Sequence, residues 1–271
     1  MEKNLEHKRH SLAHLLAAAV MELYPSAKRT IGPAIDNGFY FDFDFGDTPV
    51  LEADLVKIEV KMRELLPTWQ STTKEMLSKE RAISEYPENP FKHELINEFS
   101  PNGEELSFYK NGQYWDLCRG GHSENPAAEI AADSFKLDRI AGAYWRGDAK
   151  NKQLTRIYGL AFDTKEELDK YIWQQEEAKK RDHRILGKQL KLYTISELVG
   201  SGLPLFQKNG NILRREITDY LWQLHKDYNY EWVWTPHLAK EALYEKSGHA
   251  GSYMEDMFSV YGGTSQEKFF V

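Results

Sequence analysis

The spacing of apolar residues predicts a helix followed by a hairpin at the start of the chain. Over residues 8–24 the apolar positions recur every three or four residues, which is typical of an amphipathic helix. Phenylalanine then occupies every second position over residues 39–45, which predicts a strand with one apolar face. The preceding Asp36-Asn37-Gly38 signals the turn of a hairpin. The beginning of the chain is therefore expected to pack a helix against a sheet.

A second helix and a second hairpin are expected further along. The helix is predicted over residues 52–66, and strands are predicted at residues 106–110 and 113–117. The apolar stripe of this helix contains Leu51, Leu55, Ile58, Met62 and Leu65. Asn111-Gly112 is a strong turn signal between the two strands. Two more strands are expected, at residues 143–146 and 153–158.

A polar helix is predicted to connect this region to the rest of the chain. Thr164 and Glu167 form a capping box, and few apolar residues follow before Gly187. The remaining pattern predicts a loop, a long amphipathic helix, a strand and a short helix, at residues 200–210, 212–228, 230–235 and 239–246. The chain is therefore expected to have an α+β fold, divided into residues 1–160, a linker helix at 161–188, and residues 189–271.

Composition supports a packed chain and narrows the classes of function. Hydrophobic residues make up 41% and charged residues 28%, so a core is feasible and disorder is not expected. No apolar run is long enough to span a membrane, and the charged N-terminus does not resemble a secretory signal. The single cysteine, Cys118, excludes a disulfide framework and fits the cytoplasm. The net charge of −7 argues against a nucleic-acid binder held by bulk charge.

Two residue pairs are the strongest candidates for chemistry. His10 and His14 lie four residues apart on the first predicted helix, so both imidazoles face the same side. Cys118 and His122 form a second pair at the exit of a predicted strand. Together they offer three imidazoles and one thiol, which can bind a divalent metal or polarise a water through hydrogen bonds. Either pair alone is commonly accidental, and only their combination indicates a site.

Two further residues are candidates whose patterns are weaker. Asp116 lies two positions before Cys118, so on a strand it shares the face of that cysteine. Taken alone, it is expected to be a strand-end carboxylate facing water. Lys92 follows Phe91 at the start of a predicted helix, and taken alone it is expected to be a solvated lysine.

Several blocks of sequence then occur in one order between His7 and Phe258. They are HSLAHLLAAAVMELYPSAKRTIGPAIDNGFYFDFDF, FKHELI, YWDLCRGGH, AGAYWRGD, LTRIYG, KRDHRILGKQL, NILRREITDYLWQLHKDYNYEWVWTPHL and SGHAGSYMEDMF. In this order the chain resembles the bacterial-type threonyl-tRNA synthetases. The resemblance implies an editing domain with helices on an antiparallel sheet, a linker helix, and the start of a class II catalytic domain.

The resemblance also implies an activity and a set of site residues. The family joins threonine to its tRNA using ATP, and its editing domain hydrolyses serine wrongly attached to tRNA(Thr). The editing pocket maps onto His10, His14, Lys92, Cys118, His122 and Asp116. The histidines would hold and polarise a water, Lys92 would position the ester or stabilise charge, and Asp116 would bind the α-ammonium group. Further substrate contacts are expected at Gly32, Tyr40 and Arg119.

Partners and cofactors follow from the same resemblance. The expected partners are tRNA(Thr) and mischarged Ser-tRNA(Thr), with a homodimer in the full enzyme and no membrane. Editing is expected to need no cofactor, whereas the full enzyme uses ATP, magnesium and a zinc ion whose ligands would lie beyond Val271. A chain ending there is expected to be a fragment that does not perform threonylation. A local basic patch of Arg119, Lys92 and residues 179–184 is expected to meet the tRNA.

Departures from the family pattern and two alternatives remain. Gly121 stands where proline is common in the family, which loosens the loop that carries His122. Phe41 stands where many relatives have a tyrosine, so the phenol hydroxyl is missing here.

One alternative function is a zinc-dependent aminoacyl-tRNA hydrolase, because His10, His14, Cys118 and His122 resemble the zinc site of alanyl-tRNA editing domains. The other is a non-catalytic module that binds tRNA.

Overall fold

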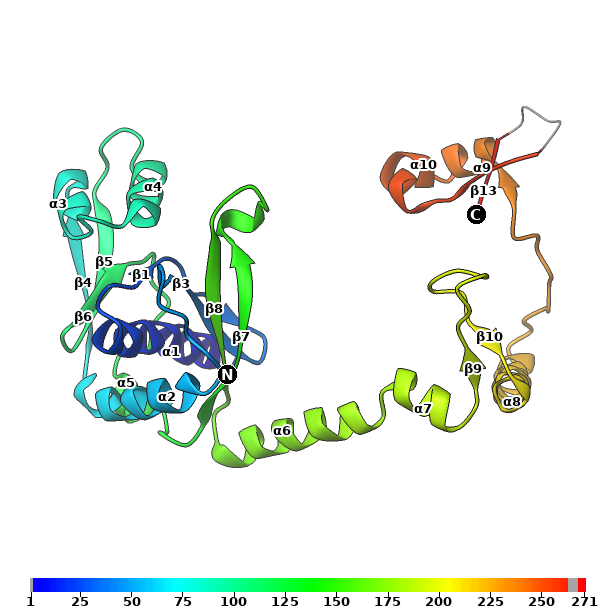
Figure 1. Cartoon of the computed structure of the whole chain (residues 1–271), viewed down its shortest axis with the longest axis horizontal. Helices are drawn as coiled ribbons and strands as arrows, with labels where there is room; N and C mark the ends of the chain where they lie inside the picture. Colours follow the sequence, from blue (N-terminus) through cyan, green and yellow to red (C-terminus); the bar gives the residue numbers. More distant parts are fainter. Residues whose placement is uncertain (1, 263–267) are drawn as a thin grey trace. The chain divides into compact units, whose positions relative to one another are not determined.

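The computed structural model describes residues 2–262 and 268–271. The chain divides into two units, Met1–Lys180 and Arg181–Val271, which are described separately (Figure 1). The first unit is built of helices and antiparallel sheets, and this confirms the predicted α+β class. No helix among the described residues has the length and apolar character that crossing a bilayer requires.

The main sheet of the first unit is antiparallel throughout. Its strands follow the order β1 (Lys28–Arg29), β3 (Gly38–Asp44), β8 (Gln153–Ala161) and β7 (Phe135–Tyr144), and β2 (Ala34–Ile35) pairs with β3. The β2–β3 pair is the predicted hairpin, and the predicted phenylalanine strand is confirmed. β7 covers ten residues and begins well before the strand predicted at residues 143–146. The last two residues of that predicted strand belong instead to a short 3-10 helix, Trp145–Gly147.

Two helices pack against one face of this sheet. They are α1 (Glu2–Leu23) and α2 (Asp54–Leu65), and a 3-10 turn, Leu66–Thr68, follows α2. The phenylalanine side chains of β3 point into the core between helices and sheet, and all are buried. Leu55, Ile58 and Met62 lie on the buried face of α2 as predicted. Leu51 precedes the helix and is 63% exposed, so its assignment to the stripe is wrong.

A smaller sheet carries the second core of this unit. Its antiparallel strands are β4 (Thr72–Leu77), β5 (Leu106–Asn111) and β6 (Tyr114–Leu117), and the same core contains residues of α3 (Lys79–Ser84) and α4 (Pro90–Phe99). Asn111 pairs with Tyr114, so the turn consists of Gly112 and Gln113 rather than Asn111-Gly112. Gly112 has a φ of 57°, which suits the first central position of a two-residue hairpin turn.

The predicted connector helix is interrupted. α6 (Lys165–Lys180) ends before Asp182, which caps a separate helix, α7 (His183–Gln189). A short helix of the first unit, α5 (Pro126–Glu129), precedes β7 in the sequence.

The predicted capping box at the start of α6 is half confirmed, because Thr164 Oγ1 accepts the Glu167 N–H at 3.3 Å. The Glu167 carboxylate reaches the N–H of Asp163 instead of the cap residue.

The second unit contains short elements and one long helix. In chain order after α7 they are β9 (Tyr193–Thr194), β10 (Leu205–Phe206), α8 (Lys208–Lys226), β11 (Ala239–Lys240), α9 (Glu241–Lys246), α10 (His249–Ser252), a 3-10 turn (Met254–Asp256), β12 (Ser259–Tyr261) and β13 (Lys268–Phe270). The long amphipathic helix is confirmed, although it begins before the predicted residue 212 and includes Gly210 from the predicted loop.

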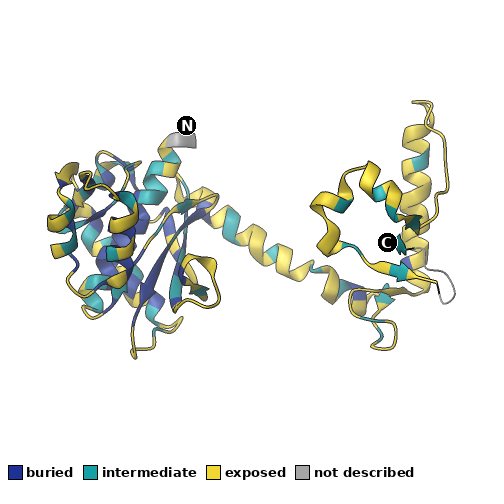
Figure 2. Cartoon of the chain, turned by 90° about the horizontal axis from the view of Figure 1, so that it is seen from above, coloured by how far each residue is buried: buried dark blue, intermediate teal, exposed yellow. Residues whose placement is uncertain are grey.

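The strand predicted at residues 230–235 is wrong. These residues have no regular structure, and their side chains are exposed. A strand needs a partner for its backbone groups, and none of the described strands pairs with this segment. Figure 2 shows that buried residues gather in the first unit, whereas the second unit is mainly exposed.

Candidate functional site

The first helix presents two histidines to one site. His10 and His14 lie one turn apart on α1, with ring centroids 5.1 Å apart. His14 is buried and His10 is partly buried. Ser11, between them, accepts the N–H of Ser123 at 3.0 Å. That hydrogen bond ties the helix to the loop in which His122 lies, so the two segments keep a fixed spacing.

The loop after β6 brings Cys118 and His122 to the same place. The Cys118 N–H donates to the Ser107 carbonyl at 3.1 Å, and the Ser107 hydroxyl donates to the Cys118 carbonyl at 2.6 Å. The chain then turns through Gly120 and Gly121, which have φ values of 109° and 83°. Residues with a side chain rarely adopt such φ angles, so glycine at both positions allows His122 to fold back over His10. The two rings stack at 4.2 Å.

The four predicted ligating groups converge within one small volume. One donor atom from each of His10, His14, Cys118 and His122 lies within 4.8 Å of the others. The Cys118 Sγ is 3.5 Å from His10 Nε2 and 3.2 Å from His122 Nε2. The structure therefore brings together two residue pairs that are more than 100 residues apart in the sequence.

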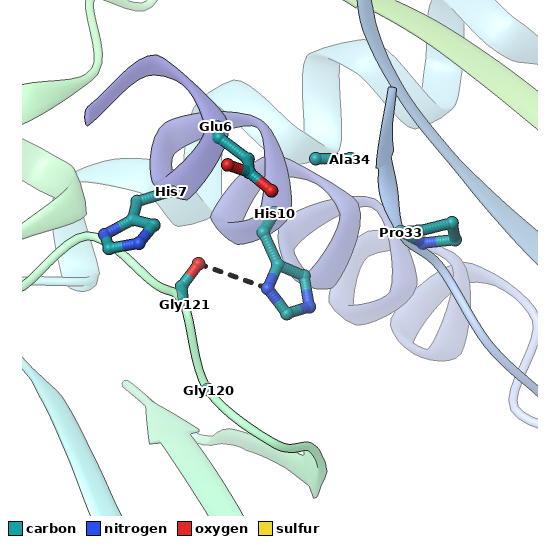
Figure 3. Close-up of a pocket in the computed structure, with 7 residues that line it drawn as sticks. All are labelled: Glu6, His7, His10, Pro33, Ala34, Gly120 and Gly121. Carbon is teal, nitrogen blue, oxygen red and sulfur yellow. Dashed lines mark hydrogen bonds between the residues drawn. The ribbon is translucent and has the colours of Figure 1, made fainter. Parts of the chain in front are cut away.

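Hydrogen bonding fixes the tautomer of one imidazole. His10 Nδ1 lies 3.1 Å from the Gly121 carbonyl, which can only accept, so Nδ1 carries the proton (Figure 3). The neutral ring then presents the lone pair of Nε2 to the thiol. His14 Nδ1 and His122 Nδ1 are buried without a hydrogen-bond partner among the described residues. Both nitrogens are enclosed by protein, so any hydrogen-bond partner would have to lie inside the cluster.

Burial keeps the side chains of this cluster neutral. Desolvation lowers the pKa of His10, and it lowers that of His14 well below the ordinary value, helped by the neighbouring histidines. Desolvation, with the charge of His10, lowers the pKa of His122 to about 3. Desolvation also raises the pKa of Cys118 to about 11. At neutral pH the site thus contains neutral imidazoles and a thiol, not a thiolate nucleophile.

Lys92 and Asp116 form a buried ion pair beside the cluster. Asn89 caps α4 by accepting the Lys92 N–H, and the Lys92 Nζ lies 2.8 Å from Asp116 Oδ1. The two side chains are only 3% and 1% exposed. The expectations of a solvated lysine and a water-facing carboxylate are therefore wrong, and Lys92 is not available to a surface patch for tRNA. Arg119 is exposed and lies 4.1 Å over the ring of Phe99.

Three residues that sequence reasoning missed surround Asp116. Tyr86 donates its hydroxyl to Asp116 Oδ1 at 2.5 Å, and Tyr114 donates to Oδ2 at 2.9 Å. Arg29 Nε lies 3.3 Å from Oδ1. Burial opposes the charge of Asp116, but Lys92 and Arg29 together hold the pKa of this carboxyl below its usual range. The alternation of β6, which places Tyr114 beside Asp116, is the only sequence signal for this group.

A cavity of about 270 Å³ opens beside these side chains. Its lining includes most of the predicted site residues: His10, His14, Gly32, Lys92, Asp116, Cys118 and Arg119. His122 belongs to the cluster but does not line this cavity. Tyr40 does not line it either, because alternate residues of β3 face the core and Tyr40 faces the opposite side, where Arg156 lies 3.8 Å over its ring.

A second cavity adjoins the first along the start of α1. It has a volume of about 280 Å³ and is lined by Glu6, His7, His10, Pro33, Ala34, Gly120 and Gly121 (Figure 3). His10 and Pro33 line both cavities. The imidazole of His10 therefore stands at the boundary between the Lys92-lined cavity and this one.

Comparison with known proteins gives close relatives. The threonine--tRNA ligase of Borrelia turicatae is 46% identical over 95% of this chain and 44% of the relative. That of Deinococcus radiodurans is 46% identical over 93% of the chain and 39% of the relative, and that of Gloeobacter violaceus is 44% identical over 98% and 42%. The chain thus spans less than half the length of these relatives. No protein-family model matches it.

Proposed function

We propose that this chain, homologous over nearly its whole length to threonine--tRNA ligases, hydrolyses serine wrongly esterified to tRNA(Thr). The observation that carries the proposal is the convergence of neutral imidazoles, a thiol and a buried lysine around one cavity. The elements that supply them come from distant parts of the sequence.

Such an activity answers a discrimination problem. Serine lacks one methyl group of threonine, and a missing methylene changes binding by only about 1–3 kcal/mol. A synthetic site that hydrogen-bonds the hydroxyl therefore accepts both, and a second site can destroy the wrong ester. The cavity, at about 270 Å³, is much larger than a methyl group, so its total volume does not exclude threonine. Threonine must instead be excluded by the cavity walls close to the reacting ester.

The histidines are suited to activating a water. His10 is neutral, and its Nε2 lone pair points into the cluster because Nδ1 donates to Gly121. A water bound among His10, His14 and His122 can give up a proton to an imidazole as it attacks the ester carbonyl. Which imidazole takes the proton stays open. Cys118, as a thiol, can hydrogen-bond to the imidazoles without reacting itself.

Lys92 is suited to the charge that develops on the ester oxygen. Its ammonium lines the cavity and is fixed by Asp116, so it requires little reorganisation when the oxyanion forms. Most bonds to Asp116 fall on Oδ1, and Oδ2 receives one from Tyr114. Oδ2 is therefore the oxygen we assign to the α-ammonium group of the substrate. Gly32 and Arg119 remain proposed substrate contacts, whereas Tyr40 lies on the wrong face.

The test is deacylation of Ser-tRNA(Thr) by the chain and by single variants. His10→Ala, His122→Ala and Lys92→Ala should each lower the rate by about 100-fold or more. His249→Ala, an exposed histidine in the second unit, is the matched control and should keep the parent rate. Parent rates in all three site variants would overturn the proposal.

A zinc-dependent hydrolysis is the second candidate, and the donor set favours it. Zinc accepts three imidazoles and one thiolate in a tetrahedron, and the Cys118–histidine separations of 3.2 and 3.5 Å suit such a shell. His10 also has the carbonyl partner that zinc-bound histidines use, but His122 Nδ1 has no such partner among the described residues. In this role His10, His14, Cys118 and His122 would hold the ion, and a water would have to join as a fifth ligand or replace one of the four before the ion could acidify it.

Metal analysis separates the two candidates. Protein purified without a histidine tag should contain well below one zinc per chain if the water is activated by imidazoles alone. One zinc that survives dialysis, with activity lost on chelation, would favour the metal route. A chain that binds tRNA(Thr) but leaves Ser-tRNA(Thr) intact would instead be a binding module. ATP-dependent threonylation, named for relatives more than twice as long, is proposed for no residue of this chain.

A further inference from the structure

Arg29 reaches the site from the edge of the main sheet. It ends β1 and its guanidinium enters the second core, where Nε lies 3.3 Å from Asp116 Oδ1. Arg29 does not line the cavity that contains Lys92. Its ion pair with Asp116 is its direct charged contact with the proposed site residues.

Several contacts hold the guanidinium of Arg29 in one place. Its Nη2 donates to the Trp115 carbonyl at 3.1 Å, and Asn89 donates to the Arg29 carbonyl at 2.8 Å. The rings of Tyr86 and Tyr114 each lie 5.1 Å from its central carbon. Contact with two rings, a carbonyl and a carboxylate suits the forked guanidinium of an arginine better than the single ammonium of a lysine. Asn89 is also the residue that caps α4, so one side chain anchors both Arg29 and the helix that carries Lys92.

The charges in this group do not balance. Arg29 and Lys92 carry two positive charges, and Asp116 carries one negative charge. The side chains are 15%, 3% and 1% exposed, so water compensates little of the difference. Buried cations in excess are costly unless an anionic group joins them. Lys92 lines the cavity of the proposed deacylation site.

We infer that Arg29 is a positioning residue for this reaction, holding Asp116 so that the charge of Lys92 is left for the oxyanion of the ester. The inference rests on the proposed deacylation. With Arg29 in place, Oδ1 of Asp116 is shared between two cations, and the group keeps an excess positive charge, to which the α-ammonium assigned to Oδ2 adds, until negative charge forms in the cavity. Without Arg29, Asp116 and Lys92 neutralise each other, and the ammonium is drawn to the carboxylate rather than to the ester.

The test compares Arg29→Gln with a matched arginine elsewhere in the same unit. Arg63 also pairs with a carboxylate, donates to backbone carbonyls and lies over an aromatic ring, but it is on α2, away from the cavity. Arg29→Gln should lower kcat for Ser-tRNA(Thr) by about 10-fold or more with KM little changed, because the interaction is used only in the transition state. Arg63→Gln should leave both parameters near the parent values.

Two further variants separate the effect of charge from the effect of a folding failure in Arg29→Gln. Arg29→Lys restores the charge but not the contacts of the guanidinium, so it should recover only part of the lost kcat. Tyr86→Phe removes the hydroxyl that donates to Asp116 Oδ1 and accepts the Leu117 N–H, and that N–H keeps its second acceptor, Asp116 Oδ1; the variant should therefore lower kcat even if Arg29→Gln does not fold.

Equal kcat for Arg29→Gln and Arg63→Gln in an active parent would overturn this inference alone, as would a rise in KM without a fall in kcat. An inactive parent chain would overturn the proposed function and this inference together.

Discussion

Removing the negative charge of Asp116 should destabilise the first unit more than removing the positive charge of Lys92. Asp116→Asn leaves two buried cations, Arg29 and Lys92, without a counterion. Breaking a buried ion pair by removing one partner costs about 3–5 kcal/mol. Lys92→Met leaves Asp116 with Arg29, two tyrosine hydroxyls and the Leu117 N–H, so its charge stays compensated.

The magnitude follows from this difference in compensation. We expect Asp116→Asn to lower the free energy of unfolding by about 4 kcal/mol and Lys92→Met by less than about 2 kcal/mol. Adding Lys92→Met to Asp116→Asn should recover part of the loss, because one unpaired cation is removed. Asp138→Asn, whose partner Arg139 is 55% exposed, is the control and should cost less than about 1 kcal/mol.

Native-state hydrogen exchange of the β5 amides measures these free energies. These amides lie in the central strand of the smaller sheet, so they report on the core that contains Asp116, independently of residues 181–271. If Lys92→Met lowers the free energy of unfolding as much as Asp116→Asn or more, the argument that Asp116 is the shared counterion of two buried cations is refuted.

Three other perturbations test the geometry of the site. Gly120→Ala should lower deacylation by about 10-fold or more, because Gly120 has a φ of 109° and its Cβ would come within 2.7 Å of the Tyr109 hydroxyl, which would shift the loop between Cys118 and His122; an unchanged rate would contradict this loop geometry. Gly32→Ala should destabilise the chain by about 1–3 kcal/mol, because its Cβ would come within 2.1 Å of the Phe41 ring, whereas Gly251→Ala, with nothing within 4 Å, should cost little in the same thermal unfolding assay. Acidification from pH 7.5 to 5.5 should lower the free energy of unfolding by about 1.4 kcal/mol for each of His14 and His122, because their folded pKa values lie below the unfolded value and only the unfolded state takes up the proton. Urea titrations across this range check the sign, and unfolding that becomes harder on acidification would contradict it.

Local patterns predicted the parts of the fold that depend on local spacing. The period-two phenylalanines required a strand with one buried face, and β3 has that form because its phenylalanines pack under α1. The spacing of His10 and His14 likewise placed both rings on one side of a helix. The turn at Gly112 moved by one residue because pairing between the strands, rather than the dipeptide, determines where the loop begins.

Long-range burial was not visible in the sequence. Lys92 resembled a solvated lysine because nothing adjacent to it shows that Asp116 and Arg29 pack beside it from other elements. The strand expected at residues 230–235 had strand-like composition, but strand formation depends on a partner that local sequence does not specify. Arg29 was missed because its role depends on three contacts from distant residues.

Parallel hydrolysis of Ser-tRNA(Thr) and Thr-tRNA(Thr) by the unmodified chain measures the proposed selectivity most directly. The proposed function predicts that the seryl ester is cleaved at least about 10-fold faster than the threonyl ester, because one methylene group changes binding by about 1–3 kcal/mol. Equal rates for the two esters, or no cleavage of either, would contradict the account.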